Sequence, residues 1–417
     1  MFNNSGLSLN QAPPIDVVLR LFFSGSLFAI AGSIMLLFWH DKLNLITSPE
    51  TLIVVHTFTI GFMASFMLGA LFQMMPVLCG VHIKAPVDLS IRVMHTLNFG
   101  LISLLFGFYN NSEALYVLAI ILLGFAFFAS AFSMIRRLLK INHSNSSRGM
   151  LIAVISLALT IIFAILMLLF RVGINLPLNY LALKSIHFNF GVFGWISILI
   201  LSVSFQVIEM FYVTPKYNSK YAKYTPLAIF SLLLIYMVAT LFNIDAFFIP
   251  YILALILAIH ASITLVKFKQ KKRPVNDASI WFWIAGMSFL ILFFISFLLN
   301  FSIVVVASFF AFFAISVIFA MSYKIVPFLV WFHLNAKGYF EAPMMHEVIS
   351  PKYAKVNFWI YLVGTITFIL SLFAPIIFYI AIFSLLSAFS MLSFAIYNGW
   401  QKYNYTIENK KRFNFNT

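Results

Sequence analysis

The stretch from Ser185 to Phe211 reads SIHFNFGVFGWISILILSVSFQVIEMF, and it decides the class of fold. It is long enough to cross the roughly 30 Å hydrocarbon core of a bilayer, which needs about 20 apolar residues of α-helix. Similar apolar stretches recur along the whole 417-residue chain, separated by short polar connections. We therefore predict an all-α, polytopic membrane protein whose surroundings are the lipid bilayer.

The composition supports this prediction, because 63% of the residues are hydrophobic and only 9% are charged. A soluble domain carries about a quarter of its residues as charged side chains. The hydropathy pattern predicts twelve transmembrane helices, with their shortest connections at Asn300-Phe301 and Ala374-Pro375. They are expected at 17–39, 51–78, 89–109, 114–136, 149–171, 183–211, 224–242, 247–267, 279–299, 302–332, 354–373 and 375–400.

The net charge of +15 fits a membrane orientation better than a nucleic-acid partner. If the N-terminus is cytoplasmic, only Lys42, Arg171 and Lys184 of the 26 Lys and Arg residues fall on the outer side. This asymmetry follows the positive-inside rule. It predicts a multi-pass protein of the bacterial inner (plasma) membrane with both termini cytoplasmic, and no nucleic-acid partner. The single cysteine, Cys79, excludes an intramolecular disulfide.

A short pattern recurs at the inner ends of the second, sixth and tenth predicted helices. An aromatic residue precedes Gln73, Gln206 and Lys324, and two apolar residues and a Pro or Glu follow. Gly61 and Gly194 each stand twelve residues before the glutamine of their helix. Residues 1–417 are therefore expected to form one membrane domain of three parallel four-helix repeats, at about 17–136, 149–267 and 279–400. The alternative is that aromatic and Pro residues commonly end membrane helices.

Two of the nine histidines, His56 and His187, are predicted at similar depth in the outer half of the membrane. An imidazole in hydrocarbon needs a partner, because an unsatisfied polar group there costs several kcal/mol. At 100° per residue, His187 shares a helix face with Gly191 and Gly194. These glycines leave room for a flat macrocycle or for the close approach of another helix. We predict that the two histidines bind haem b, with copper or iron as the other metals considered. The alternative is that each hydrogen-bonds a neighbouring helix and binds nothing.

The motif around His187 resembles the C-type haem-copper oxidases. Their helix reads approximately H-x-H-x-G-x-L-G-W and continues, about ten residues later, into Y-Y-x-x-P. The matching positions here are His187, Asn189, Gly191, Phe193, Gly194, Trp195, Phe205, Gln206 and Glu209. With the twelve spans and the three repeats, this chain is similar to haem-copper oxidase subunit I and to NnrS-type membrane proteins. The resemblance implies that His187 ligates a high-spin haem and that His56 ligates a low-spin haem.

The departures from that family bear directly on activity. Asn189 stands where the second histidine of the motif is expected, and the motif lies on the sixth helix rather than the tenth. The tandem histidines that hold the active-site copper are missing from the seventh helix. We therefore reject a proton-pumping oxidase and expect no catalytic residues. The expected role is in redox chemistry, nitric-oxide response or haem and metal handling. If the protein is an enzyme, it is a haem-dependent oxidoreductase. Respiratory-chain proteins are the possible partners.

Two other functions remain open. A transporter would use isolated polar groups as a substrate path, and the candidates are Gln73, Asn189, Gln206, Glu209 and Lys324. Lys324 is expected to snorkel to the interface or to pair with Glu209. A non-catalytic partner of a respiratory complex would bind no ligand of its own.

In the longest connection, Glu341, His346 and Glu347 are expected to lie in a solvated loop or short interfacial helix rather than in a metal site.

Overall fold

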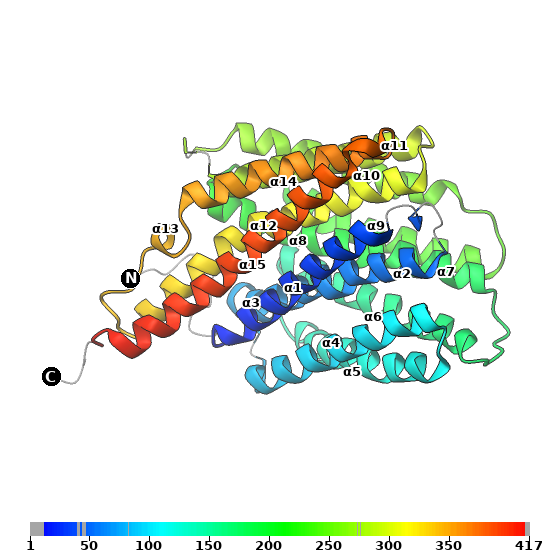
Figure 1. Ribbon diagram of the computed structural model, residues 1–417, viewed down its shortest axis with the longest axis horizontal. Helices are drawn as coiled ribbons and strands as arrows, with labels where there is room; N and C mark the ends of the chain where they lie inside the picture. The colour runs from blue at the N-terminus through cyan, green and yellow to red at the C-terminus, as the bar shows by residue number, and fades with distance from the viewer. Residues whose placement is uncertain are drawn as a thin grey trace. The chain divides into compact units, whose positions relative to one another are not determined.

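The computed structural model describes residues 12–39, 42–43, 47–81, 83–272, 274–275 and 277–412. Within these residues every named element is a helix (Figure 1). Twelve helical runs are long and apolar enough to cross a membrane. The predicted all-α polytopic membrane protein with twelve spans is therefore confirmed.

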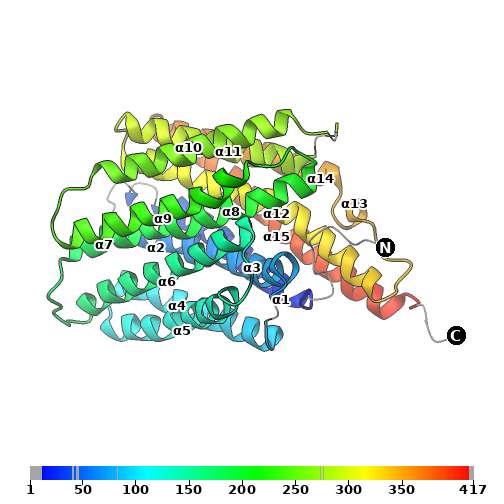
Figure 2. The same ribbon diagram turned by 180° about the vertical axis from the view of Figure 1, so that it is seen from behind.

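The spans agree with the predicted ranges to within a few residues, except that some helices continue beyond the apolar core (Figures 1 and 2). The first six spans are α1 (Asp16–Trp39), α2–η3–α3 (Pro49–Cys79), α4 (Pro86–Asn110), α5 (Glu113–Leu138), α6 (Asn145–Arg171) and α7–η4–α8 (Tyr180–Tyr212). The last six are α9 (Ser219–Leu241), α10 (Phe248–Lys269), α11 (Ala278–Leu298), α12 (Ile303–Ala336), α14 (Pro351–Ser371) and η5–α15 (Pro375–Asn409).

Polar side chains start and stop these helices in the short connections. Asn179 and Asn218 each accept two backbone N–H groups at the first turns of α7 and α9. Asparagine also ends helices, because it tolerates the left-handed conformation. Asn111, Asn243 and Asn300 have φ values of 47°, 55° and 54° directly after or shortly after α4, α9 and α11. The predicted break at Asn300-Phe301 is thus made by a left-handed asparagine.

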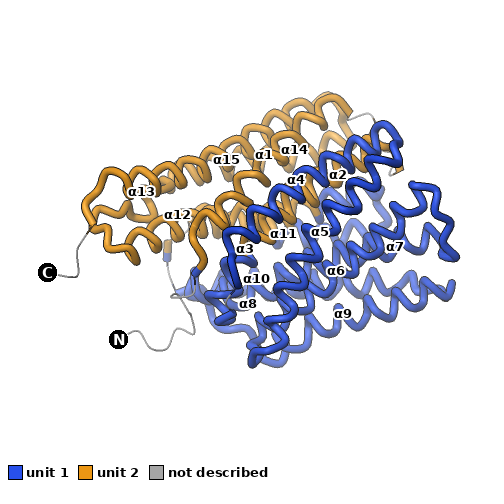
Figure 3. Tube along the Cα trace, turned by 90° about the horizontal axis from the view of Figure 1, so that it is seen from below, with its two compact units in different colours: residues 1–12, 71–274, 287–310 blue, residues 13–70, 275–286, 311–417 orange. Residues whose placement is uncertain are grey.

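The chain divides into two compact units by its internal contacts (Figure 3). Unit 1 contains residues 1–12, 71–274 and 287–310, and unit 2 contains residues 13–70, 275–286 and 311–417. Unit 1 therefore includes α4 to α10, and unit 2 includes α1, α2, α14 and α15. The expectation of one membrane domain stays a prediction.

In unit 1, α6 is the central helix, and it contacts α5, α7, η4, α8 and α9. Two glycines allow it to approach the sixth span closely. A Cβ at Gly194 would lie 2.8 Å from the Cβ of Ser156, and a Cβ at Gly149 would overlap Oγ of Ser202. Small residues at such crossings let backbones approach, which favours helix association in lipid.

In unit 2, α15 packs against both α1 and α14. Phe389 of α15 lies at the centre of an aromatic cluster, with ring centroids 5.9 Å from Phe58, 5.4 Å from Phe62 and 5.5 Å from Phe319. Gly32 of α1 faces Phe58, since a Cβ there would meet the phenyl ring at 2.8 Å. The core of this unit is therefore built largely from phenylalanine rings packed over small residues.

Two spans contain an eight-residue π-helical segment. These segments are η3 (Thr57–Ala64) and η4 (Phe190–Ser197). Each begins sixteen residues before a glutamine, Gln73 in one span and Gln206 in the other, so their registers coincide. π-Helix is rare and is often found at functional sites. The expectation of one continuous α-helix below His187 is wrong, because an i→i+5 segment turns less per residue and changes which residues share a face.

Candidate functional site

His187 lies at the last turn of α7 and is half-buried. Its Nδ1 lies 3.0 Å from the backbone carbonyl oxygen of Thr160 on α6. The predicted need for a polar partner is therefore met by the backbone of the neighbouring helix. A carbonyl oxygen only accepts hydrogen bonds, so Nδ1 carries the proton when the imidazole is neutral, and Nε2 carries the lone pair.

His56 ends α2, directly before η3, and is also half-buried. Its Nδ1 lies 2.7 Å from the carbonyl oxygen of Leu52 in its own helix. The next residue, Thr57, donates its hydroxyl to Ile53 O at 2.8 Å. The same reasoning gives His56 the tautomer with the proton on Nδ1 and the lone pair on Nε2.

Both imidazoles therefore have the arrangement that metal- and haem-ligating histidines have in known sites. Such a histidine usually donates its other ring N–H to a carbonyl or carboxylate, which fixes its tautomer and orientation. His56 belongs to unit 2 and His187 to unit 1. Each imidazole is therefore anchored within its own unit, and the matched depth of the two histidines stays a prediction.

The two glycines below His187 have different surroundings. Gly194 is buried, and Ser156 of α6 occupies the space that a side chain would need. This glycine therefore allows close helix packing and leaves no room for a macrocycle. Gly191 is half-buried, and a Cβ there would meet only Thr160 Cγ2, at 3.6 Å. Of the two, Gly191 is the position where a small residue is not required by helix contact.

Of the polar-path candidates in unit 1, Asn189 and Gln73 are the most buried, at 5% and 6% exposure. Asn189 Nδ2 donates to Ser185 O at 2.9 Å, while Asn189 Oδ1 and Gln73 Oε1 have no protein partner. Gln206 is half-buried. Glu209 is half-buried as well, and its Oε1 accepts the backbone N–H of Tyr217 at 2.6 Å.

Lys324 forms an ion pair with Asp277 inside unit 2, while the expected pairing with Glu209 of unit 1 stays a prediction. The lysine side chain is 13% exposed, so the pair is partly withdrawn from water and free snorkelling does not describe it. Burial raises the pKa of Asp277, but hydrogen bonds from Lys324 and Ser279 outweigh it and hold the pKa below the usual value. Sequence reasoning missed Asp277 because it lies outside the apolar spans.

The connection between α12 and α14 contains a single helical turn, α13 (Met345–Val348). Glu341 pairs with Lys410 at 2.6 Å, and Glu347 accepts the backbone N–H of Met344 at 2.8 Å. His346 is exposed. Both carboxylates thus have protein partners in this connection.

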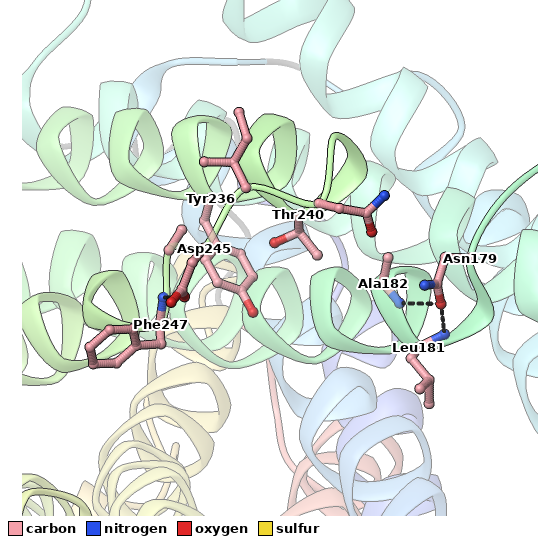
Figure 4. Close-up of a pocket in the computed structure, with 10 residues that line it drawn as sticks. Asn179, Leu181, Ala182, Tyr236, Thr240, Asp245 and Phe247 are labelled. Atoms are coloured by element: carbon pink, nitrogen blue, oxygen red, sulfur yellow. Dashed lines mark hydrogen bonds between the residues drawn. The ribbon is translucent and has the colours of Figure 1, made fainter.

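An open cavity of about 420 Å³ lies in unit 1, between the start of α7 and the end of α9 (Figure 4). Its lining includes Tyr236, Thr240 and Asp245, with Asn179 at the beginning of α7. The Tyr236 hydroxyl lies 2.5 Å from Ser185 Oγ. Since the Ser185 carbonyl accepts Asn189 Nδ2, a line of polar contacts leads from the cavity wall to a buried amide. Sequence reasoning did not identify this cavity, because Tyr236 gives no signal within an apolar span.

Among the residues that the structure describes, no three His, Cys, Asp or Glu side chains gather so as to hold a metal ion. Comparisons of the sequence with models of known protein families and with curated proteins find no match. Function is consequently inferred from the geometry within this chain.

Proposed function

We propose that this chain is an integral membrane protein that binds haem b, which Nε2 of His187 would hold in unit 1 and Nε2 of His56 would hold in unit 2. The observation that carries the proposal is the anchoring of each Nδ1 to a backbone carbonyl, at 3.0 Å and 2.7 Å. A porphyrin supplies the equatorial nitrogens and needs only one or two axial ligands from the protein. Single histidines therefore suit haem better than a bare copper or iron ion, which needs several ligands from the protein. A bound haem would supply electron transfer or the binding of a diatomic gas such as nitric oxide.

The shared register of η3 and η4 supports a repeated architecture of the haem-copper oxidase subunit I or NnrS type. Both segments have the same length and the same spacing to a glutamine, and both follow a histidine closely. Independent helices would rarely acquire the same uncommon distortion at one position. We propose three parallel four-helix repeats, of which the third has departed furthest, because α12 carries Lys324 in place of the glutamine and no histidine before His333.

The proposed role is redox chemistry, nitric-oxide response or haem handling in the bacterial inner membrane, with both termini cytoplasmic. Oxygen reduction by a haem-copper centre is not proposed, since the seventh span has none of the histidines that would hold its copper. Respiratory-chain proteins are the proposed partners. Catalysis by this chain alone is not part of the proposal.

The test is an absorption spectrum with metal analysis of protein purified in mild detergent from cells supplied with a haem precursor. The expected result is a Soret band and iron in a fixed ratio to protein. His187→Ala and His56→Ala should each reduce or change that band. His95→Ala is the matched control, because His95 lies in a span but is exposed and stacks on Phe99 at 6.3 Å.

Wild-type protein that is folded but has neither Soret band nor iron would overturn the haem proposal. Unchanged haem content in both His187→Ala and His56→Ala would do the same. A band that disappears only with His187→Ala would reduce the proposal to a single axial ligand. Loss in the His95→Ala control would point to general unfolding, which gel filtration detects independently.

A second function, transport of a small polar solute, is favoured by one observation. The open cavity in unit 1 leads through Tyr236 and Ser185 to Asn189, whose buried Oδ1 has no protein partner. Isolated polar groups within a span are the usual components of a substrate path. Solute uptake into proteoliposomes that is lost in Tyr236→Phe and Asn189→Leu, and is indifferent to haem, would support it.

A further inference from the structure

Among the described histidines of unit 1, His260 on α10 has the smallest exposed fraction. Only 2% of its surface is exposed. Its neighbours come from α8, from the connection after α8, and from the start of α9, whose labels appear in Figure 2. We define the His260 cluster as the side chains that contact its ring or extend its hydrogen bonds, namely Ser204, Phe205, Tyr217, Tyr221, His260 and Thr264. None of these residues belongs to the proposed haem ligands.

Both ring nitrogens of His260 face hydroxyl groups. Nδ1 lies 3.1 Å from the Tyr221 hydroxyl, and Nε2 lies 3.1 Å from Ser204 Oγ. Thr264 Oγ1 lies 3.5 Å from the same Nε2. The Tyr217 hydroxyl lies 2.9 Å from Thr264 Oγ1, which extends the series of hydroxyls by one more member.

This arrangement differs from that of His187 and His56 in one chemical respect. A carbonyl only accepts, so it fixes one tautomer, whereas a hydroxyl can either donate or accept. Ser204 donates its hydroxyl to Leu201 O at 2.7 Å and so accepts from Nε2, which favours the tautomer with the proton on Nε2. In the other tautomer, Nδ1 donates to the Tyr221 oxygen and Thr264 Oγ1 donates to Nε2. Each tautomer therefore keeps a hydroxyl partner at both ring nitrogens, which a proton relay requires.

Aromatic rings hold the imidazole in one orientation while its protons change place. Tyr217 and Tyr221 are stacked with it, with interplanar angles of 16° and 10° and centroid distances of 5.9 Å and 6.3 Å. Phe205 meets the ring edge-on at 5.7 Å. The two ring nitrogens therefore keep facing the same hydroxyl groups, through which a proton can be transferred.

The cluster reaches the edge of the membrane span. Tyr221 is half-buried in the first turn of α9, and Tyr217 lies in the connection that precedes that helix. Tyr217 is held there by Glu209, which accepts its backbone N–H, and by Lys267, whose ammonium lies 4.5 Å from its ring centroid. Lys267 also donates to Lys216 O at 2.7 Å. Tyr217, Tyr221, Glu209 and Lys267 are the titratable groups close to the cluster.

Burial raises the pKa of Tyr217 to about 12, although hydrogen bonds from Thr264 and Ser204 act in the opposite direction. The Tyr217 hydroxyl therefore keeps its proton near neutral pH. It takes part in proton transfer only by releasing its own proton while it accepts a second one. This is the behaviour expected of a relay member rather than of a permanent base.

We propose that His260 is a proton-transfer site that exchanges protons with the aqueous boundary through the Tyr221 hydroxyl. In one transfer, the Tyr221 O–H bond breaks, its proton binds Nδ1, and water returns a proton to the Tyr221 oxygen. The Nε2–H bond breaks as its proton binds Thr264 Oγ1, the Thr264 hydroxyl proton passes to the Tyr217 oxygen, and the Tyr217 hydroxyl proton passes to water, which balances the proton that water gave to Tyr221. No electrons are transferred, and the imidazole ends as the other neutral tautomer. This site is independent of haem binding at His187.

The test is nitrogen NMR of protein labelled with ¹⁵N in the histidine rings and held in lipid nanodiscs. Protonated and unprotonated ring nitrogens have well separated resonances, and the resonances absent from His260→Gln identify His260. The expected result is exchange between both tautomers, with ring protons that exchange with solvent. A single fixed tautomer with unexchanged ring protons would overturn the proposal and make His260 a structural residue.

A second measurement uses Tyr221→Phe, which keeps the stacked ring and removes the hydroxyl. Proton exchange at His260 should slow by at least about tenfold, equivalent to about 1.4 kcal/mol in the barrier, and the tautomer with the proton on Nε2 should dominate. The matched control is Tyr236→Phe, because Tyr236 bonds Ser185 and not His260. An unchanged exchange rate in Tyr221→Phe would refute the role of Tyr221. If His260→Gln does not fold, the resonances that shift in Tyr221→Phe supply the assignment.

Discussion

Replacing Gly194 with alanine tests whether the close approach of α6 to η4 holds unit 1 together. The new Cβ would lie 2.8 Å from Ser156 Cβ, whereas ordinary contacts begin at 3.4 Å. The two segments must therefore separate by about 0.6 Å, the difference between those distances. Overpacking of this kind costs about 1–3 kcal/mol. That cost lowers the folding equilibrium constant by about 5- to 150-fold.

The matched control is Gly191→Ala, in the same π-helical segment. Its Cβ would meet only Thr160 Cγ2, at 3.6 Å, which is an ordinary contact. Replacing glycine by alanine in a helix gains about 0.5–1 kcal/mol where there is room. Gly191→Ala should therefore be neutral or stabilising, so the two variants differ in sign although their sequence change is the same.

The assay is reversible unfolding in lipid bicelles, completed by a double-mutant cycle with Ser156→Gly. Removing the Ser156 Cβ removes the atom that the new methyl group of Gly194→Ala would strike, so the double variant should recover most of the lost stability. The coupling energy should fall within about 0.5–3 kcal/mol, the range for residues in contact. If Gly194→Ala is as stable as Gly191→Ala, or if Ser156→Gly gives no recovery, the inferred close packing is refuted.

Three further predictions concern charged and polar groups. Asp277→Asn should destabilise the protein by about 1 kcal/mol, after allowance for solvent screening at a carboxylate that is 33% exposed. Burial raises the pKa of Asp277, but the larger effect of Lys324 and Ser279 leaves it below the usual value. The stability that the ion pair contributes is therefore present above about pH 4 and is lost as the pH falls. Unfolding curves from neutral to acidic pH should converge for wild type and variant, and parallel curves would contradict the ion pair. Tyr217→Phe should remove a phenol that titrates near pH 12; its raised pKa adds stability below about pH 10 that is lost at higher pH. Alkaline difference spectra measure this step, and a spectrum unchanged by the variant would contradict it. Gln73→Met should be neutral or stabilising, because Oε1 is buried without a protein partner and desolvation of such a group costs about 1–3 kcal/mol. The same bicelle unfolding assay on Gln206→Met, which is half-buried, should show a smaller gain, and a clear loss with Gln73→Met would contradict the prediction.

The helices and their order could be predicted from the sequence because the cost of exposing polar backbone to lipid leaves few alternatives. Asn300 and the Ala374-Pro375 pair also identified the shortest breaks, since both disfavour a continuing helix. The interruption of two spans by π-helix was not predictable. It depends on backbone hydrogen-bond register, which leaves the hydropathy pattern unchanged.

The candidate sites were predictable only in part. His187 and His56 were identified because an imidazole in an apolar span requires a partner, but the partners are backbone carbonyls, which no side-chain pattern reveals. The pairing of Lys324 with Asp277 joins residues 47 positions apart in the chain. The His260 cluster was missed because serine and threonine hydroxyls within spans usually bond their own helix and give no distinct signal.

The π-helical segment η4 also sets the angular phase between the two ends of its span. Its residues each turn less than the 100° of an α-helix, so the eight of them change the angle between His187 and Gln206 from that of an uninterrupted α-helix. The segment η3 changes the angle between His56 and Gln73 in the same way, because the two segments have equal length and spacing. The face that each histidine shares with the inner end of its span is therefore set by the π-helical segment and not by the count of residues alone.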